Sequence, residues 1–348
     1  MARRRATSAW VKAFNRNLRA MARAAKQPPR APRVARAKAA ARGVATGPGD
    51  WLPGLALGPG GARRFRLYRP PGLTPGERVP LLVMLHGCGQ DSASFAASTR
   101  MNALARREGF LVLYPEQDRL ANAQRCWNWY DTRSGRAQAE AALILAAIDQ
   151  VVLLYPADPA RIALAGLSAG AGMAALLATR EPARFQAVVM HSGVAPGMAD
   201  STATALAAMR GRRVSASGET PADAATQPWP PLLVVQGGSD AVVSPSNGAA
   251  VAQLWAERLG AGAGAPRELR RGQRHPMTVT DFKHRGRALV SLVEVPRLGH
   301  AWSGGTASQP YSDARGPDAS RMAWAFVARQ FRRTLGMGTP AKPATLDR

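Results

Sequence analysis

Residues 161–173 constrain the fold more than any other stretch of the chain. A short apolar run ends there in a Gly-x-Ser-x-Gly motif at positions 166–170 and continues into Ala-, Leu- and Met-rich sequence. A serine held at a sharp strand-to-helix turn has a strained backbone, and side chains two residues away on either side would collide. Gly166 and Gly170 avoid those collisions. The pattern therefore predicts a strand, a sharp elbow with Ser168 as a nucleophile at its tip, and a helix.

Strand and helix patterns alternate through the rest of the chain. Apolar runs predict strands at 79–85, 110–115, 186–190, 231–235 and 289–295, and helical patterns lie at 95–108, 137–155, 246–260 and 318–333. This alternation predicts the α/β class, with a mostly parallel central sheet and helices on both faces. Residues 64–69 alternate in polarity like an edge strand, and the polar, Ala-rich residues 196–228 are expected to form an excursion over the site.

A serine hydroxyl is a poor nucleophile at neutral pH and needs a base that is itself oriented by a carboxylate. In the α/β hydrolase architecture the chain order is Ser, then Asp or Glu, then His, and each partner lies in a loop after a strand. Ser168, Asp240 and His300 satisfy both conditions. His191 also follows a predicted strand, but it precedes Asp240 and so has the wrong order. We therefore expect a catalytic triad of Ser168, Asp240 and His300.

The loop after the predicted strand at 79–85 supplies candidates for an oxyanion hole. This strand ends in His86 and Gly87, and glycine allows the loop to turn its N–H groups inward. We expect the backbone N–H groups of Cys88 and Ala169 to stabilise an oxyanion, because the second of them begins the helix after the elbow. For His86 we expect a role in anchoring the loop.

Three tryptophans lie next to these motifs. Trp127 and Trp129 follow the predicted strand at 110–115, and Trp302 follows His300. Their rings are expected to bind substrate by lining a cleft for an acyl or polymer chain. Packing of the 126–130 loop over the edge of the sheet is an equally good interpretation.

Positive charge is concentrated near the amino terminus. The chain has 348 residues and a formal net charge of +25, and its first 49 residues carry 13 basic and no acidic side chains. Residues 8–26 have the pattern of an amphipathic basic helix, which suits contact with an anionic surface or a polymer granule, or docking on the chain's own domain. The rest of the chain is only moderately basic, and no specific nucleic-acid partner is expected.

We expect three regions in the chain. Residues 1–50 form a basic helix and a flexible linker, residues 51–336 form one α/β hydrolase catalytic domain, and residues 337–348 form a disordered tail. No run of about 18 apolar residues occurs, so no transmembrane segment is expected. Arginines interrupt every candidate apolar core near the amino terminus, so an ordinary signal peptide is not indicated.

Seven motifs, which span roughly residues 60–335, are specific when they are taken together. They are Leu85–Gln90, Tyr114–Gln117, Cys126–Trp129, Gly166–Gly170, Gly238–Asp240 with Asn247–Gly248, Leu298–Gly305 and Arg315–Ser320. In this combination the chain resembles the polyhydroxybutyrate depolymerase family of esterases, and feruloyl and acetylxylan esterases share the framework. The resemblance implies the triad Ser168, Asp240 and His300. It also suggests that Cys88 and Cys126 pair, whereas two free thiols are the default in a reducing cytosol.

The resemblance implies a serine esterase that needs no metal and no cofactor. The expected substrates are poly- or oligo(3-hydroxybutyrate) or similar short-chain hydroxyalkanoate esters. The alternatives are a feruloyl- or acetylxylan-type carboxylesterase, and a protein with a hydrolase fold that binds a polymer granule or surface. Two features depart from the family pattern: Ala171 stands where many members have glycine, and we expect no polymer-binding domain after the catalytic one. The family favours an extracellular or periplasmic location, with a cytoplasmic or granule-associated one as the alternative.

Overall fold

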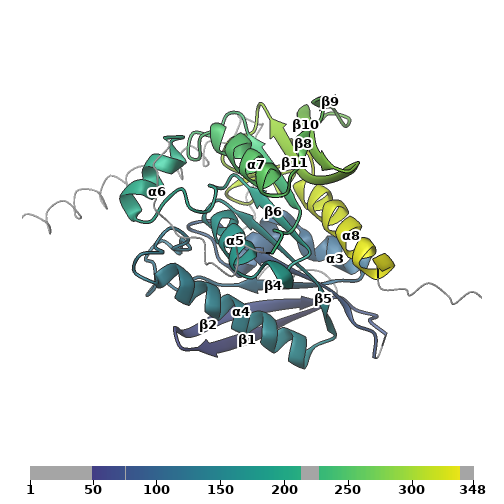
Figure 1. Cartoon of the computed structure of the whole chain (residues 1–348). Coiled ribbons are helices and arrows are strands. Elements are labelled where there is room, and N and C mark those ends of the chain that lie inside the picture. Colours follow the sequence, from purple (N-terminus) through teal and green to yellow (C-terminus); the bar gives the residue numbers. More distant parts are fainter. Residues whose placement is uncertain (1–48, 75, 213–226, 338–348) are drawn as a thin grey trace, which may run out of the picture.

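The computed structural model describes residues 49–74, 76–212 and 227–337. The expected basic helix at 8–26, most of the linker, residues 213–226 of the excursion and nearly all of the expected tail lie outside the described residues. Figure 1 shows the described part as one sheet with helices packed on its faces.

A single large sheet organises the described residues. Eleven strands form it in the order β1-β2-β4-β3-β5-β6-β7-β11-β10-β8, with β9 paired to β10. The strands are β1 (Asp50–Gly58), β2 (Gly61–Arg69), β3 (Val79–Leu85), β4 (Leu111–Pro115), β5 (Ala157–Leu167), β6 (Ala187–His191), β7 (Leu232–Gly237), β8 (Gly262–Ala263), β9 (Arg267–Leu269), β10 (Met277–His284) and β11 (Arg287–Val295). The six strands from β4 to β11 in this order are parallel, and antiparallel strands flank them on both sides. The predicted mostly parallel α/β sheet is confirmed.

Helices cover both faces of this sheet (Figure 1). They are α2 (Ser92–Thr99), α3 (Met101–Glu108), α4 (Arg136–Leu154), α5 (Ala169–Arg180), α6 (Thr202–Met209), α7 (Ser246–Arg258) and α8 (Ala319–Met337). Ile144 of α4, Leu177 of α5 and Trp255 of α7 belong to one buried apolar cluster. Phe95 of α2 and Phe326 of α8 belong to a second cluster. Each face of the sheet therefore buries its own apolar layer, which is why the parallel strands are apolar on both sides.

The structure corrects the expectation of an edge strand at residues 64–69. β2 lies between β4 and β1, and β1 pairs with it from Asp50 opposite Arg69 to Gly58 opposite Gly61. Pro53 and Gly54 interrupt the pattern of β1, so the sequence does not predict this strand. A Cβ atom on Gly54 would lie 2.0 Å from the Phe65 ring, so the glycine allows that ring to cross the strand.

The structure differs from the sequence-based expectation in one helix and in one further strand. The helix expected at 95–108 is two helices, because Arg100 adopts a left-handed conformation with φ of 55° and ends α2. At the other side of the sheet, β10 pairs antiparallel with β11, where no strand is predicted. β10 alternates between buried and half-buried or exposed residues, because it lies near the sheet margin and not among the parallel central strands.

One helix in the described part of the chain, α4, is long and apolar enough to cross a membrane, with a mean hydropathy of 1.6. It packs on β1 and β2 in the structure, and its Ile144 and Ile148 side chains are fully buried. Its Glu140 side chain is also buried and accepts hydrogen bonds from neighbouring loops. These contacts identify α4 as a core helix of the α/β layer.

The described part of the excursion contains α6, which joins two loops at the carboxyl ends of the parallel strands. The Met209 carbonyl at the end of α6 accepts a hydrogen bond from the Ser244 N–H at 2.7 Å, close to the loop after β7. On the other side, Asp200 forms an ion pair with Arg133, which follows the aromatic loop at residues 126–130. The segment therefore lies beside the edge of the sheet where the predicted site residues gather.

Candidate active site

The turn from β5 into α5 has the geometry of a nucleophile elbow. Ser168 has φ of 57° and ψ of −119°, a conformation that L-residues rarely adopt. A Cβ atom on Gly166 would lie 2.3 Å from the backbone of Gly170, and one on Gly170 would lie 2.1 Å from the Leu85 carbonyl oxygen. The two glycines therefore allow the strand, the helix and the end of β3 to meet at the serine. The predicted strand, elbow and helix are confirmed.

Asp240 and His300 lie together at the same edge of the sheet. They follow β7 and β11, which are neighbouring parallel strands. The Nδ1–H group of His300 donates to Oδ2 of Asp240 at 2.8 Å. The other oxygen, Oδ1, accepts the N–H groups of Val242 and Val243, each at 2.9 Å. Burial alone would raise the pKa of Asp240, but the hydrogen bond and charge of His300 and the two N–H groups hold it below its usual value.

Ser168 directly follows β5, which is separated from β7 by the single strand β6. Its backbone N–H donates to the carbonyl oxygen of His191 at 2.9 Å, so the elbow is tied to β6. Its hydroxyl group makes no hydrogen bond to any described residue. The structure thus pairs His300 with Asp240, and among the described residues no hydrogen bond joins His300 to the Ser168 hydroxyl. The complete triad stays a prediction.

The predicted oxyanion donors lie on two neighbouring segments: Ala169 begins α5, and Cys88 lies in the loop after β3, whose end approaches Gly170. Ala169 is the first residue of α5, where the helix leaves N–H groups without partners inside the helix. Among the described residues, none accepts a hydrogen bond from the Cys88 N–H, whereas the next residue, Gly89, donates to the Gln124 carbonyl at 2.8 Å. Two N–H groups are therefore available beside the elbow, and the positive end of α5 favours an anion there.

The structure confirms that His86 anchors the loop after β3. Its ring is fully buried, Nδ1–H donates to the Gly87 carbonyl at 2.9 Å, and Nε2 accepts the Gln117 N–H at 3.1 Å. Burial lowers the pKa of His86 to about 4, so the ring is neutral at neutral pH. A second tie to the same loop is covalent, because Cys88 and Cys126 form a disulfide. The disulfide therefore ties the loop after β3 to the aromatic loop.

The structure corrects the substrate-binding role expected for Trp127 and Trp302. Both side chains are fully buried, with no exposed surface that a substrate could reach. The Trp127 ring packs against His86, with ring centroids 5.4 Å apart. The Trp302 ring packs edge-on against Phe95, and its Nε1–H group donates to Ser320 Oγ at 3.1 Å. Large aromatic side chains bury the most apolar area, and these two fill the core beside the loops.

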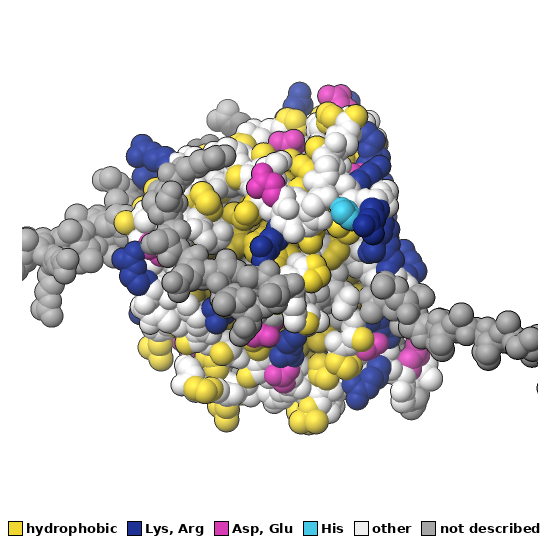
Figure 2. Space-filling view, in the orientation of Figure 1, with side chains coloured by type: hydrophobic (Ala, Val, Ile, Leu, Met, Phe, Trp, Pro, Cys, Tyr) yellow, Lys and Arg dark blue, Asp and Glu magenta, His cyan; other side chains and the backbone are white. Residues whose placement is uncertain are grey.

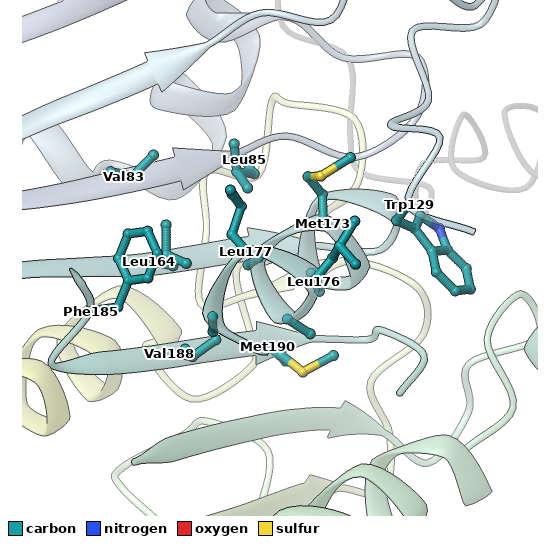
Figure 3. Close-up of a cluster of buried hydrophobic side chains, with 14 of the residues drawn as sticks. Val83, Leu85, Trp129, Leu164, Met173, Leu176, Leu177, Phe185, Val188 and Met190 are labelled. Atoms are coloured by element: carbon teal, nitrogen blue, oxygen red, sulfur yellow. The ribbon is translucent and has the colours of Figure 1, made fainter. Parts of the chain in front are cut away.

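Trp129 is 7% exposed and lies at the active-site end of α5, beyond Met173 and Leu176 (Figure 3). A Cβ atom on Gly172 would lie 2.8 Å from its indole ring, so this glycine allows the ring to rest on the helix. Tyr130 packs edge-on against the same ring, with centroids 5.6 Å apart. Substrate contact by Trp129 stays a prediction.

Sequence reasoning missed a buried polar network beneath the aromatic loop. Glu140 of α4 accepts from Gln117 Nε2 at 2.7 Å, from Asn128 Nδ2 at 2.6 Å and from the Asn128 N–H at 2.9 Å. The Arg63 guanidinium in turn donates to Gln117 Oε1, and its centre lies 5.6 Å from the Trp127 ring. Burial lowers the pKa of Arg63, and the Glu140 charge opposes that shift. A lone glutamate within an Ala- and Leu-rich helix is the signal that could have indicated this network.

The fold is that of the α/β hydrolases, with a strained serine elbow and an aspartate–histidine pair at the carboxyl edge of the sheet. A family model described as esterase PHB depolymerase matches residues 63–268, more than half of the chain. The chain belongs to this family.

Curated relatives agree with this assignment, and a solved structure shares the fold. Poly(3-hydroxyalkanoate) depolymerase C of Paucimonas lemoignei is 32% identical over 200 residues, which cover 54% of this chain and 46% of the relative. Feruloyl esterase B of Neurospora crassa is 32% identical over 33% of this chain and 39% of its own length. The chain therefore spans less than half the length of these two curated relatives. An acetyl xylan esterase from Aspergillus awamori shares the fold, with a TM-score of 0.56 and 18% identity over 76% of this chain and 94% of that one.

Proposed function

We propose that this protein is a serine carboxylesterase in which Ser168 is the nucleophile, His300 the general base and Asp240 the group that orients His300. The observation that carries the proposal is the 2.8 Å hydrogen bond between His300 and Asp240 at the sheet edge that also holds the strained Ser168 elbow. With Nδ1–H committed to the aspartate, Nε2 of His300 is the nitrogen that accepts a proton.

The reaction has two halves. In the first, Ser168 Oγ attacks the ester carbonyl carbon while His300 Nε2 takes the hydroxyl proton, and the N–H groups of Cys88 and Ala169 stabilise the oxyanion. His300 then gives that proton to the departing alcohol, which leaves an acyl group on Ser168. In the second half, water attacks the acyl-enzyme as His300 removes its proton. Return of that proton to Ser168 Oγ releases the acid.

For the substrate we propose short-chain 3-hydroxyalkanoate esters, as oligomers or amorphous polymer. The name of the Paucimonas lemoignei relative supports this class. The runner-up is an aryl or acetyl ester of plant polysaccharide, which the feruloyl and acetyl xylan esterase relatives support. Stacking on an aromatic acid requires accessible rings, and the burial of Trp127 and Trp302 leaves only Trp129 of the three predicted tryptophans near the surface. This burial favours the aliphatic acyl group.

The proposed surroundings follow from charge and redox chemistry. The basic residues near the amino terminus are proposed to hold the protein at an anionic surface or polymer granule, and Figure 2 shows further Lys and Arg side chains spread over the described body. The Cys88–Cys126 disulfide supports an oxidising compartment, outside the cell or in the periplasm, because thiols stay reduced in the cytosol.

The test compares kcat/KM for four substrates: a 3-hydroxybutyrate oligomer, methyl ferulate, acetylated xylan and a long-chain p-nitrophenyl ester. We expect the oligomer to be preferred, and Ser168→Ala to lower kcat by roughly 10⁶. A preference for methyl ferulate or acetylated xylan would overturn the substrate proposal and leave the mechanism standing. Full activity in Ser168→Ala would overturn the mechanism. A wild-type protein that binds granules but hydrolyses no ester, including p-nitrophenyl butyrate, would instead be a surface-binding protein.

A further inference from the structure

His191 is a buried histidine that the proposed triad does not use. It is the last residue of β6, the strand between β5, which leads to Ser168, and β7, which leads to Asp240. The side chain is fully buried. Its place in the sheet is rigid, because β6 is hydrogen-bonded to parallel strands on both sides.

The backbone of His191 holds the nucleophile. Its carbonyl oxygen accepts the N–H of Ser168 at 2.9 Å, which fixes the position of the elbow relative to the end of β6. The next residue, Ser192, has φ of 51° and donates its N–H to the Val235 carbonyl of β7 at 2.9 Å. The turn that begins at His191 is therefore held by both neighbouring strands.

The ring of His191 holds the other half of the site. Nε2 accepts the backbone N–H of Ser303 at 3.1 Å, and the ring stacks on Trp302 with centroids 5.1 Å apart and an interplanar angle of 27°. Trp302 and Ser303 form the short strand β12 (Trp302–Ser303), which directly ends the loop that carries His300. Since Nε2 accepts, the proton lies on Nδ1, which donates to Ser192 Oγ at 3.2 Å.

A neutral ring is required for this contact, because a protonated imidazole has no acceptor. Burial, followed by the nearby charge of His300, lowers the pKa of His191 to about 3. The ring therefore accepts the Ser303 N–H throughout the pH range in which His300 would act as a base.

We infer that His191 is a positioning residue that sets the distance between the Ser168 nucleophile and the His300 base. One residue bonds to the serine through its backbone and to the histidine loop through its ring, so it links two segments that are more than 130 positions apart in the chain. A misplacement of about 1 Å between reacting groups can cost a factor of about 10² in rate. The inference rests on the proposed function and adds a residue outside its triad.

Three substitutions of His191 test the contribution of the aromatic ring separately from that of the acceptor nitrogen Nε2. His191→Phe keeps an aromatic ring against Trp302 but leaves the buried Ser303 N–H without an acceptor. His191→Gln gives up the ring but can place its amide oxygen near the position of Nε2, whereas the shorter side chain of His191→Asn cannot. We expect kcat to fall about 10- to 100-fold in the Phe and Asn variants with KM nearly unchanged, and the Gln variant to stay within about fivefold of wild type.

The matched control is His275→Phe. His275 is also buried, but its Nε2 atom lies 3.4 Å from Asp313, and among the described residues it makes no hydrogen bond to the elbow. Its loss should lower stability without the selective loss of kcat. Thermal unfolding of each variant and the downfield proton NMR signal of the His300–Asp240 hydrogen bond complete the test, and we expect this signal to broaden or shift in the Phe and Asn variants only.

Each result decides between specific outcomes. Wild-type kcat in folded His191→Phe, or equal losses in His191→Gln and His191→Asn, would overturn the positioning role. If His191→Phe does not fold, the comparison of Gln with Asn still decides. If the wild-type protein hydrolyses no ester, the proposed function fails, and the NMR signal then tests separately whether His191 holds His300 in place.

Discussion

Asp240 holds His300 by one carboxylate oxygen while the other oxygen is held by the chain itself. Oδ2 lies 2.8 Å from His300 Nδ1, and Oδ1 accepts the N–H groups of Val242 and Val243 at 2.9 Å. The carboxylate side chain is fully inaccessible to solvent, so no water competes for these bonds. The two backbone N–H groups thus orient the carboxylate independently of the imidazole. The carboxylate in turn favours the imidazole tautomer with its proton on Nδ1.

This arrangement predicts the behaviour of Asp240→Asn. The amide oxygen of asparagine can still accept the two backbone N–H groups, but its NH₂ group faces His300 Nδ1 and favours the tautomer with the proton on Nε2. That tautomer cannot accept a proton from Ser168, so we expect kcat to fall by roughly 10⁴ with little change in Tm. Steady-state kinetics and thermal unfolding measure both. Asp149→Asn removes an exposed ion pair with Arg184 and should leave kcat unchanged. An active Asp240→Asn variant would argue against this assignment.

Gly170 allows α5 to touch the end of β3. A Cβ atom there would lie 2.1 Å from the Leu85 carbonyl oxygen, which is backbone and cannot rotate away. We expect Gly170→Ala to lower the free energy of unfolding by about 3 kcal/mol and Tm by roughly 6–12 °C. Gly262→Ala is the control, because a Cβ atom at Gly262 meets nothing within 4 Å. Equal melting temperatures for the two variants would contradict the packing argument.

The disulfide between Cys88 and Cys126 closes a loop with a sequence separation of 38 residues. Replacing both cysteines by serine should cost about 4 kcal/mol through the entropy of the unfolded chain. It should also lower kcat, because the disulfide holds the loop whose backbone N–H at position 88 is a proposed oxyanion donor. Alkylation of the native protein without reductant, followed by mass spectrometry, tests the bond directly. Modification of both thiols would show that the protein carries them reduced.

Two buried histidines predict how stability depends on pH. Burial lowers the pKa of His86 to about 4 and that of His191 to about 3, from 6.5. Below about pH 6.5 the unfolded chain binds protons that the folded chain does not, so the free energy of unfolding falls as the pH drops toward 4. Each histidine contributes at most roughly 1.4 kcal/mol per pH unit in this window.

Thermal unfolding between about pH 7 and about pH 4.5 measures this effect. His86→Gln should flatten the decline in Tm, whereas His284→Gln, at an exposed histidine, should not. A wild-type Tm that stays constant over this range would contradict the prediction that the two buried histidines stay neutral in the folded protein.

The sequence predicted the elements whose pattern is local. The apolar run and glycine spacing at 166–170 predicted the elbow, and the continuous apolar runs predicted the parallel strands, because burial on both faces leaves a strong signal. It predicted neither β1 nor β10, since strands at a sheet margin are half exposed and depend on a partner for their pairing.

Ala171 shows how a local departure is resolved in three dimensions. This residue is fully buried, and a Cβ atom on Gly193 would lie 2.6 Å from its methyl group. Glycine at position 193, after β6, therefore leaves the space that the alanine occupies. The sequence alone shows both residues but not that they face each other.

The sequence by itself determined the chemistry that the site can offer: a serine at an elbow, with an aspartate and a histidine in order after strands. Only the tertiary structure decided which side chains surround them. Trp127 and Trp302 are buried and not exposed to substrate. Glu140 accepts a hydrogen bond from Asn128, and His191 accepts one from the Ser303 N–H. Residue type and spacing are encoded along the chain, but burial is decided when distant segments pack together, so no local pattern reveals which face of a loop meets solvent.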